Sequence, residues 1–198
     1  MAVYEGLEEL GENLKMFKNL RPLPMLQGQR ILSYRGAMWH LHTAELHRGI
    51  RDLSSRHGID VPVLEEVLRL SIRLSDESKG ALITVGCHDS VIKFSDPPKT
   101  GHITWERMRL GESPDESILG LMSQDGATIV SGSGEVVQGM TFLRPPAGTV
   151  AEEEVGKGSK HSTAAKISKI AGAVCVAVSV DGRVTVYSRG AIAFKIMG

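Results

Sequence analysis

From residue 61 onward the chain alternates between amphipathic segments and short apolar runs, and this order limits the fold more than any other feature of the sequence. Helices are predicted where apolar residues recur at helical spacing, in residues 61–78, 113–124 and 162–172. Strands are predicted in residues 81–85 and 91–94, and two-strand hairpins in residues 127–143 and 173–194. Strands separated by helices and combined with hairpins predict a mixed sheet covered by helices, in a single α/β or α+β domain.

Residues 1–58 precede this pattern and are predicted to form an N-terminal helical segment, with residues 59–198 as the main domain. Residues 1–20 place apolar side chains at helical spacing, and residues 34–58 form a second, weaker helical pattern that ends at Gly58. Apolar stripes of this kind are usually core or a helix–helix interface. We therefore expect the segment to pack on the main domain and to set the oligomeric state.

The composition gives no global charge signal, because Lys plus Arg and Asp plus Glu both number 23. A strong basic excess, typical of a nucleic-acid or membrane surface, is therefore excluded, and any functional charge must be local. Cys87 and Cys175 lie in apolar runs without metal-ligand spacing, which predicts buried thiols in a reducing compartment. No run approaches the roughly 20 apolar residues of a membrane span, and we expect a cytoplasmic protein.

The segment GKGSKHSTAAKISKIAG, residues 156–172, places glycines, three lysines and His161 around a helix predicted to start at Ser162 or Thr163. The first N–H groups of a helix are unpaired and its dipole is positive there, so such a loop can receive a phosphate. It is not a Walker A loop, because the glycine which that pattern requires is replaced by Ala151. A capped helix with solvated lysines is the alternative interpretation.

Two acidic turns border predicted strands. Asp125, in SQDGATIV, lies between a helix end and an apolar strand, and it is the acid of that stretch that can hold a metal beside a polyphosphate. We expect it at the end of a core strand, where the site residues of open sheets collect. Ser179 and Asp181, in VSVDG, end another apolar strand. Turn chemistry alone explains both segments equally well, because Asp-Gly is a common turn pair.

Several segments, taken in order, resemble one family. GALITV after a helix, then DGATIV, LRPP, GSKHSTAAKIS and AVCVAVSVDGRVTV are similar to the DAC domain, the diadenylate cyclase domain named after the DNA-integrity scanning protein. The hallmarks of the family are an Asp-Gly-Ala motif and an Arg-His-x-x-Ala motif at a helix start. The first is intact as DGA at residues 125–127, and the second reads KHSTA at residues 160–164. The resemblance extends from about Val61 to the C-terminus.

This resemblance implies that two ATP molecules are condensed into cyclic di-AMP, with release of two pyrophosphates, across a face-to-face homodimer that uses Mg²⁺ or Mn²⁺. It implies that Asp125 lies near the metal and the attacking 3′-hydroxyl, that His161 holds the triphosphate, and that Asp181 is a further metal contact beside these two. The catalytic residues would then be Asp125 and His161. The nucleotide-binding residues that it implies are Gly101, Gly126, Ala127, Gly158, Ser159, Lys160, Ser162, Thr163 and Ser179.

Three positions depart from the family pattern. Lys160 replaces an arginine, Ser162 stands where a second arginine is usual, and Val180 stands where polar or acidic residues are common. Lysine is a point charge and lacks the planar fork with which arginine clamps two phosphate oxygens. These departures favour a second interpretation, a catalytically weak or inactive nucleotide sensor of the same fold, whereas the intact Asp125 and His161 favour the enzyme.

A third interpretation is a hydrolase or metal protein built on the histidines of WHLHTAELH. His40 and His47 would share one face two turns apart if residues 34–58 were helical. Solvated or interfacial histidines are the alternative, because no carboxylate or thiolate completes a zinc pattern around them.

Overall fold

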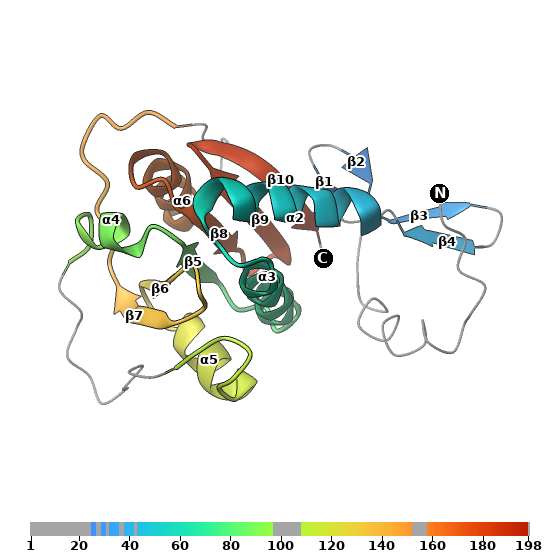
Figure 1. The fold of residues 1–198 in the computed structure, drawn as a ribbon, viewed down its shortest axis with the longest axis horizontal. Helices are drawn as coiled ribbons and strands as arrows, with labels where there is room; N and C mark the ends of the chain where they lie inside the picture. Colours follow the sequence, from blue (N-terminus) through green and yellow to red (C-terminus); the bar gives the residue numbers. More distant parts are fainter. Residues whose placement is uncertain are drawn as a thin grey trace.

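The computed structural model describes residues 43–96, 108–151 and 158–197, together with the backbone of four short strands between residues 25 and 41 (Figure 1). The helix predicted in residues 1–20 lies outside the described residues. The helices are α2 (Thr43–His57), α3 (Val61–Asp76), α4 (His88–Ile92), α5 (Asp115–Met122) and α6 (Ser159–Ile170). The strands are β1 (Met25–Leu26), β2 (Gln29–Arg30), β3 (Leu32–Arg35), β4 (Met38–Leu41), β5 (Ala81–Val85), β6 (Ala127–Val130), β7 (Val136–Thr141), β8 (Val174–Val178), β9 (Arg183–Ser188) and β10 (Ala191–Met197).

The main sheet is mixed and has the strand order β2-β1-β10-β9-β8-β5-β6-β7, while β3 and β4 pair separately. The strand β5 runs parallel to β6 and antiparallel to β8, and the other pairs of the main sheet are antiparallel. A parallel pair needs a crossover connection, and the chain between β5 and β6 passes through α4 and α5. The predicted mixed sheet with flanking helices is confirmed.

Helices cover both faces of the sheet, and for this reason β5 and β8 are buried along their whole length. In β8, Val174, Val176 and Val178 belong to the same core cluster as residues of α2, α3 and α5. The alternate residues Cys175 and Ala177 belong to a second cluster with residues of α4 and α6. This division follows from the period of two in a strand, and it places α4 and α6 on the second face of the sheet.

The helix α2 is part of the first core cluster. Its Ile50 and Leu53 are each 3% exposed and pack in the cluster that contains α3. At its end, His57 Nδ1 lies 2.6 Å from the carbonyl oxygen of Gly172 and His57 Nε2 lies 2.8 Å from Ser188 Oγ. Because the carbonyl can only accept, Nδ1 donates, and the histidine joins α2 to the ends of α6 and β9. The division of the chain at residue 58 stays a prediction.

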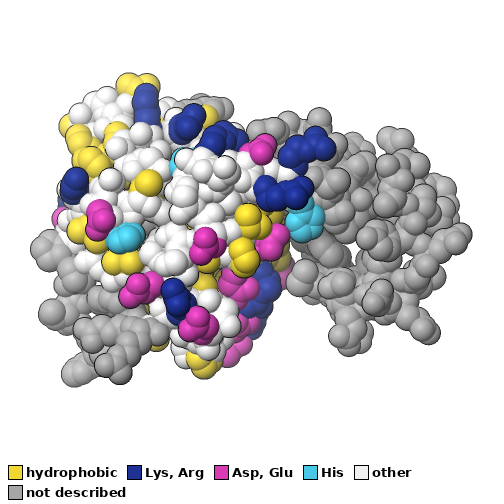
Figure 2. Space-filling view, in the orientation of Figure 1, with side chains coloured by type: hydrophobic (Ala, Val, Ile, Leu, Met, Phe, Trp, Pro, Cys, Tyr) yellow, Lys and Arg dark blue, Asp and Glu magenta, His cyan; other side chains and the backbone are white. Residues whose placement is uncertain are grey.

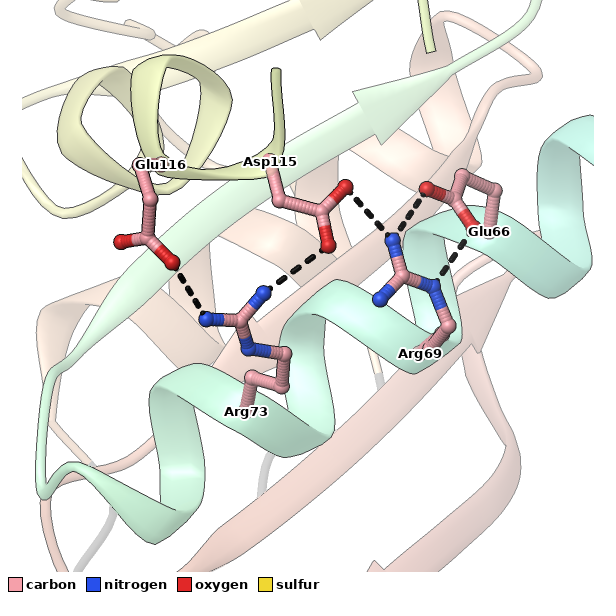
Figure 3. A network of polar contacts seen from close by, with 5 residues as sticks. All are labelled: Glu66, Arg69, Arg73, Asp115 and Glu116. Atoms are coloured by element: carbon pink, nitrogen blue, oxygen red, sulfur yellow. Dashed lines mark hydrogen bonds and ion pairs between the residues drawn. The ribbon is translucent and has the colours of Figure 1, made fainter. Parts of the chain in front are cut away.

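A network of ion pairs joins α3 to α5 (Figure 3). Arg69 donates to both carboxylate oxygens of Glu66 and to Asp115, and Arg73 donates to Asp115 and Glu116, over distances of 2.6 to 2.8 Å. Asp115 and Glu116 lie in the first turn of α5, where the helix dipole also favours negative charge. Since the arginines are 34% and 38% exposed, each pair contributes about 1 kcal/mol or less. The network fixes the orientation of α5 more than it stabilises the fold.

The histidine interpretation of residues 34–58 is wrong in its geometry. Leu32–Arg35 and Met38–Leu41 are the strands β3 and β4, and the helix begins only at Thr43. His40 therefore lies in a strand and His47 in a helix, so they do not share a helix face. His47 Nδ1 lies 3.2 Å from Glu65 Oε1 on α3, a surface contact between two helices.

Two further predictions are wrong near the ends of the core strands. Residues 91–94 are not a strand: Val91 lies in α4 and is fully buried, and a short apolar run of this kind fits either element. Cys87 is exposed, because its left-handed backbone (φ 45°) directs the chain out of β5 into α4. Cys175 is buried as predicted, and burial raises the pKa of its thiol.

The surface in Figure 2 carries both signs of charge, unevenly distributed. Acidic side chains gather over α3 and α5, and most Lys and Arg side chains lie in the upper half of the view, over α2 and beyond it. The neutral total therefore conceals a local separation of charge. In the described part of the chain, no helix combines the length and the apolar character that crossing a membrane requires.

Candidate functional site

The candidate site lies at one edge of the sheet, where four strands begin or end. Ala81, the first residue of β5, pairs with Val178, the last residue of β8. Ala127, the first residue of β6, pairs with Thr141, the last residue of β7. Asp125 therefore lies just before β6, at the N-terminal end of this buried strand. The site gathers at this edge because β7 and β8 run antiparallel to the two parallel strands between them.

A pocket of about 130 Å³ opens at this edge. The DGA segment forms one side of it, the first turn of α6 forms another, and the end of β7 with the residues after it completes the wall. The residues that line the pocket are Leu82, Asp125, Gly126, Ala127, Thr141, Phe142, Leu143, Ser159, Lys160 and Thr163. Two sequence motifs that lie more than 30 residues apart thus face the same space, which carries one acidic and one basic side chain.

The DGA segment is held tightly against β7. Gly126 has φ +104°, and a Cβ built on it would lie 2.6 Å from the carbonyl carbon of Met140 and 2.7 Å from the backbone nitrogen of Thr141. Only glycine fits this close approach of two backbones. Asp125 is exposed at the mouth of the pocket and makes no hydrogen bond or ion pair with the described residues. Its carboxylate is available to a cation or a hydroxyl proton.

The helix α6 begins at Ser159, with Gly158 as the N-cap, three residues before the predicted start. Ser159, Lys160 and Thr163 line the pocket, and His161, Ala164, Ala165 and Ser168 face the sheet and are buried. Residues spaced by three or four positions share a helix face, so the earlier start places His161 on the buried face. The spacing of His161, Ala164, Ala165 and Ser168 is visible in the sequence if the predicted helix is extended by one turn at its N-terminal end.

The ammonium of Lys160 lies over Gly80, just before β5. A Cβ on Gly80 would be 3.1 Å from Lys160 Nζ, 3.4 Å from the carbonyl oxygen of Val178 and 3.5 Å from Val180 Cγ1. Gly80 thus leaves the space that the lysine occupies. Lys160 is half-buried and makes no hydrogen bond or ion pair within the described ranges, so its charge is free to meet an anion in the pocket.

His161 lies in the interior and does not line the pocket. It is 5% exposed, its Nδ1 lies 3.0 Å from Tyr187 Oη, and its Nε2 lies 2.6 Å from Ser179 Oγ. The rings of His161 and Tyr187 are also edge to face, with centroids 6.0 Å apart. Tyr187 gave no signal in the sequence analysis, because a tyrosine in an apolar strand is usually core.

The remaining predicted site residues that the structure describes are not among those that line the pocket. Asp181 accepts from Arg183 Nε at 2.9 Å and also contacts Arg183 Nη2, in the turn after β8. Gly158 is exposed at the N-cap, and Ser162 is half-buried one residue beyond His161. Gly101 lies outside the described residues. Sequence reasoning missed the apolar and hydroxyl wall of Leu82, Thr141, Phe142 and Leu143.

The three predicted metal ligands, Asp125, His161 and Asp181, are not gathered at one point. In the described ranges there is no cluster of three or more His, Cys, Asp or Glu side chains that could hold a metal ion. A divalent cation at this pocket would therefore take Asp125 as its protein ligand and complete its coordination with ligand oxygens or water. Mg²⁺ commonly binds to proteins through one or two carboxylates plus substrate phosphates, and this donor set fits that mode.

Comparisons with known proteins identify the family of the chain. The family model described as DisA bacterial checkpoint controller nucleotide-binding, or DAC, matches residues 70–192. A diadenylate cyclase of Haloferax volcanii is 27% identical over 158 residues, which cover 76% of this chain and 58% of that protein. A diadenylate cyclase of Methanocaldococcus jannaschii is 30% identical over 142 residues, which cover 67% of this chain and 44% of that protein. The chain thus spans about half the length of these curated relatives.

A solved structure shares the fold. The hypothetical membrane spanning protein from Bacillus cereus superposes with a TM-score of 0.53 at 19% sequence identity, over 66% of this chain and 61% of that chain. This similarity shows the fold alone. The family match extends over more than half of the 198 residues, and the chain therefore belongs to the DAC family of nucleotide-binding domains.

Proposed function

We propose that the chain is a cytoplasmic diadenylate cyclase, which condenses two ATP molecules into cyclic di-AMP and two pyrophosphates across a homodimer. One observation carries the proposal: the DGA segment and the first turn of α6 line the same pocket, so that Asp125 and Lys160 face one space. The names of the two curated relatives support the same activity.

The lining of the pocket suits a nucleoside triphosphate in its charge and chemistry. Lys160 supplies a positive charge, and the N-terminus of α6 supplies unpaired N–H groups and the positive end of a helix dipole. The hydroxyl groups of Ser159 and Thr163 are further donors to phosphate oxygens. Leu82, Phe142 and Leu143 add apolar side chains to the lining of the same pocket. A mixed lining of this kind fits a ligand that combines anionic and less polar parts.

In the reaction that we propose, each subunit holds one ATP, and each ATP is attacked by the ATP that the other subunit holds. The 3′-hydroxyl oxygen of one ATP forms a bond to the α-phosphorus of its partner, and the bond from that phosphorus to the pyrophosphate oxygen breaks. The hydroxyl proton passes to the carboxylate of Asp125 or through it to water. Two such transfers close the ring and release two pyrophosphates. The work of the protein is positioning and neutralisation of charge, as in other phosphoryl transfers.

Asp125 is also the residue that would hold Mg²⁺ or Mn²⁺, which neutralises phosphate charge and lowers the pKa of a coordinated hydroxyl when bound. Asp181 is not free for this purpose in the structure, because Arg183 holds its carboxylate. His161 acts from behind the pocket, through its contacts with Tyr187 and Ser179.

The pairing of Asp181 with Arg183 and the inward contacts of His161 support the alternative function. This alternative is a nucleotide sensor of the same fold that turns over weakly or not at all. With Asp181 paired to Arg183 and His161 turned inward, Asp125 is the one carboxylate among the described residues that line the pocket. One carboxylate and a lysine are sufficient to bind a nucleotide with its metal.

The test is incubation of the purified chain with ATP and Mg²⁺ or Mn²⁺, followed by chromatography for cyclic di-AMP. The cyclase predicts product from the unsubstituted chain, a loss of at least about a hundredfold in Asp125→Asn, and full activity in Asp52→Asn, an exposed control on α2. Sedimentation of the same samples measures the proposed dimer. If no product forms but ATP still raises the melting temperature, the chain is a sensor and the cyclase proposal fails.

A further inference from the structure

A chain of hydrogen bonds lies behind the pocket and runs from β9 through α6 to β8. Tyr187 Oη and His161 Nδ1 are 3.0 Å apart, and His161 Nε2 and Ser179 Oγ are 2.6 Å apart. Tyr187 is 1% exposed and His161 is 5% exposed, whereas Ser179 is half-buried. The chain thus begins in the core and ends at a residue that is partly exposed to solvent.

The neutral imidazole gives this chain a direction, because one ring nitrogen donates and the other accepts. If Tyr187 donates to Nδ1, then the Nε2 hydrogen is donated to Ser179 Oγ, and the serine keeps its own proton for another partner. If Ser179 donates to Nε2 instead, its proton is used inside the protein. A phenolic hydroxyl is more acidic than an aliphatic one and is the stronger donor. The chemistry therefore favours the direction from Tyr187 to Ser179.

Ser179 lies beside the cationic part of the pocket. Its two neighbours in the chain, Val178 and Val180, lie beside Gly80, just before β5. A Cβ built on Gly80 would be close to atoms of both valines and also to Lys160 Nζ. The backbone of Ser179 is fixed as well, since its N–H donates to the backbone carbonyl oxygen of Arg183 across the turn, at 2.8 Å. The hydroxyl of Ser179, held in place near Lys160, can therefore be a second donor for an anion that binds beside the lysine.

We propose that Tyr187 is a positioning residue, which acts through His161 to leave the hydroxyl proton of Ser179 available to the phosphate of a bound nucleotide. The inference rests on the proposed nucleotide pocket, but it does not depend on turnover. It assigns to Tyr187 a role outside the core packing that its burial alone would suggest. It also gives His161, a histidine inside the protein, a way to influence a ligand that it does not touch.

The first test is the tautomer of His161, read from imidazole nitrogen chemical shifts in chain labelled with ¹⁵N-histidine. The chain has seven histidines, and the signals of His161 are those that disappear in His161→Gln. We expect the Nε2–H tautomer in the unsubstituted chain and a shift of population towards Nδ1–H in Tyr187→Phe. The Nδ1–H tautomer in the unsubstituted chain would overturn the inference, and this outcome does not depend on the folding of Tyr187→Phe.

The second test is the Kd of ATP with Mg²⁺, measured by calorimetry. Ser179→Ala should weaken binding on the order of tenfold, as loss of a donor to a charged group. Tyr187→Phe should weaken binding several-fold, and the double variant should bind no more weakly than Ser179→Ala, because the residues act in series. Tyr34→Phe, in the separate β3–β4 sheet, is the matched control and should leave the Kd unchanged.

The outcomes separate this inference from the proposed function. Equal Kd values for Tyr187→Phe and the unsubstituted chain would overturn the inference alone, as would additive losses in the double variant. Failure of the unsubstituted chain to bind ATP would overturn the proposed function and, with it, the role of Ser179.

Discussion

Substitution of Gly126 by alanine tests whether the DGA segment is shaped by its contact with β7. The new Cβ would lie 2.6 Å from the carbonyl carbon of Met140 and 2.7 Å from the backbone nitrogen of Thr141, closer than van der Waals contact allows. Backbone atoms cannot rotate away, so one of the two segments must shift, at a cost of about 1–3 kcal/mol as in other overpacked sites. The positive φ of +104° adds about 1–3 kcal/mol for a residue with a side chain.

Gly111→Ala is the matched control for this prediction. Gly111 has φ +77°, and no atom lies within 4 Å of a Cβ built on it. Gly111→Ala shares with Gly126→Ala the conformational cost of a positive φ and the reduced entropy of the unfolded chain. It does not share the clash. Gly126→Ala should therefore be less stable than Gly111→Ala by about 1–3 kcal/mol.

Urea unfolding followed by circular dichroism measures this difference. With a slope of about 2 kcal/mol per molar urea, the midpoint of Gly126→Ala should lie roughly 0.5–1.5 M below that of Gly111→Ala. Equal midpoints would show that β7 yields without cost, and the reasoning from close backbone approach would then be wrong. The same variant should also lose nucleotide affinity, since a shift of the DGA segment moves Asp125 relative to Lys160.

Two further predictions follow from groups away from the pocket. In native protein, iodoacetamide should modify Cys87 but not the buried Cys175, and unfolded protein should gain both adducts by mass spectrometry; modification of Cys175 in the native state would contradict its burial. The hydrogen bond from Arg69 lowers the pKa of Asp115. The ionised carboxylate therefore stabilises the fold above the ordinary aspartate pKa of about 3.9. This contribution is lost as the pH falls through the lower pKa of the folded state. The stability gap between the unsubstituted chain and Asp115→Asn should therefore close below about pH 4 in unfolding titrations, and a gap independent of pH would exclude the ionised pair as its cause.

The sequence predicted the central elements because their patterns admit one interpretation. The helix α3 has a long apolar stripe, and the strands β5 and β8 are short runs between turn residues. The strand β10 was missed because its connection to β9 lacks the usual turn pair. Ser188 pairs with Ala191 across a two-residue turn, and both residues of that turn, Arg189 and Gly190, have positive φ. Asn-Gly or Asp-Gly is the common sequence for such a turn, and arginine there gives no signal.

The candidate site was predictable in its motifs but not in its walls. DGA and the start of α6 carry polar residue types that differ from their surroundings, so a pattern in the sequence marks them. Leu82, Phe142 and Leu143 are apolar residues beside core strands, and only the sheet register brings them to the pocket. No local pattern separates an apolar residue that lines a pocket from one that fills a core.

The phase of α6 decides which residues of its KHSTA motif can meet a ligand. One face of the helix carries His161, Ala164 and Ala165 into the sheet, so the neighbouring Lys160 and Thr163 must turn towards the pocket. An anion that enters from solvent therefore meets an ammonium and the helix N-terminus before it can reach the imidazole. A histidine with both nitrogens bonded inside the protein cannot also coordinate a metal without breaking one of those bonds. The replacement of arginine by lysine in this motif thus falls on the residue that carries the charge of the pocket, while the intact histidine maintains the shape behind it.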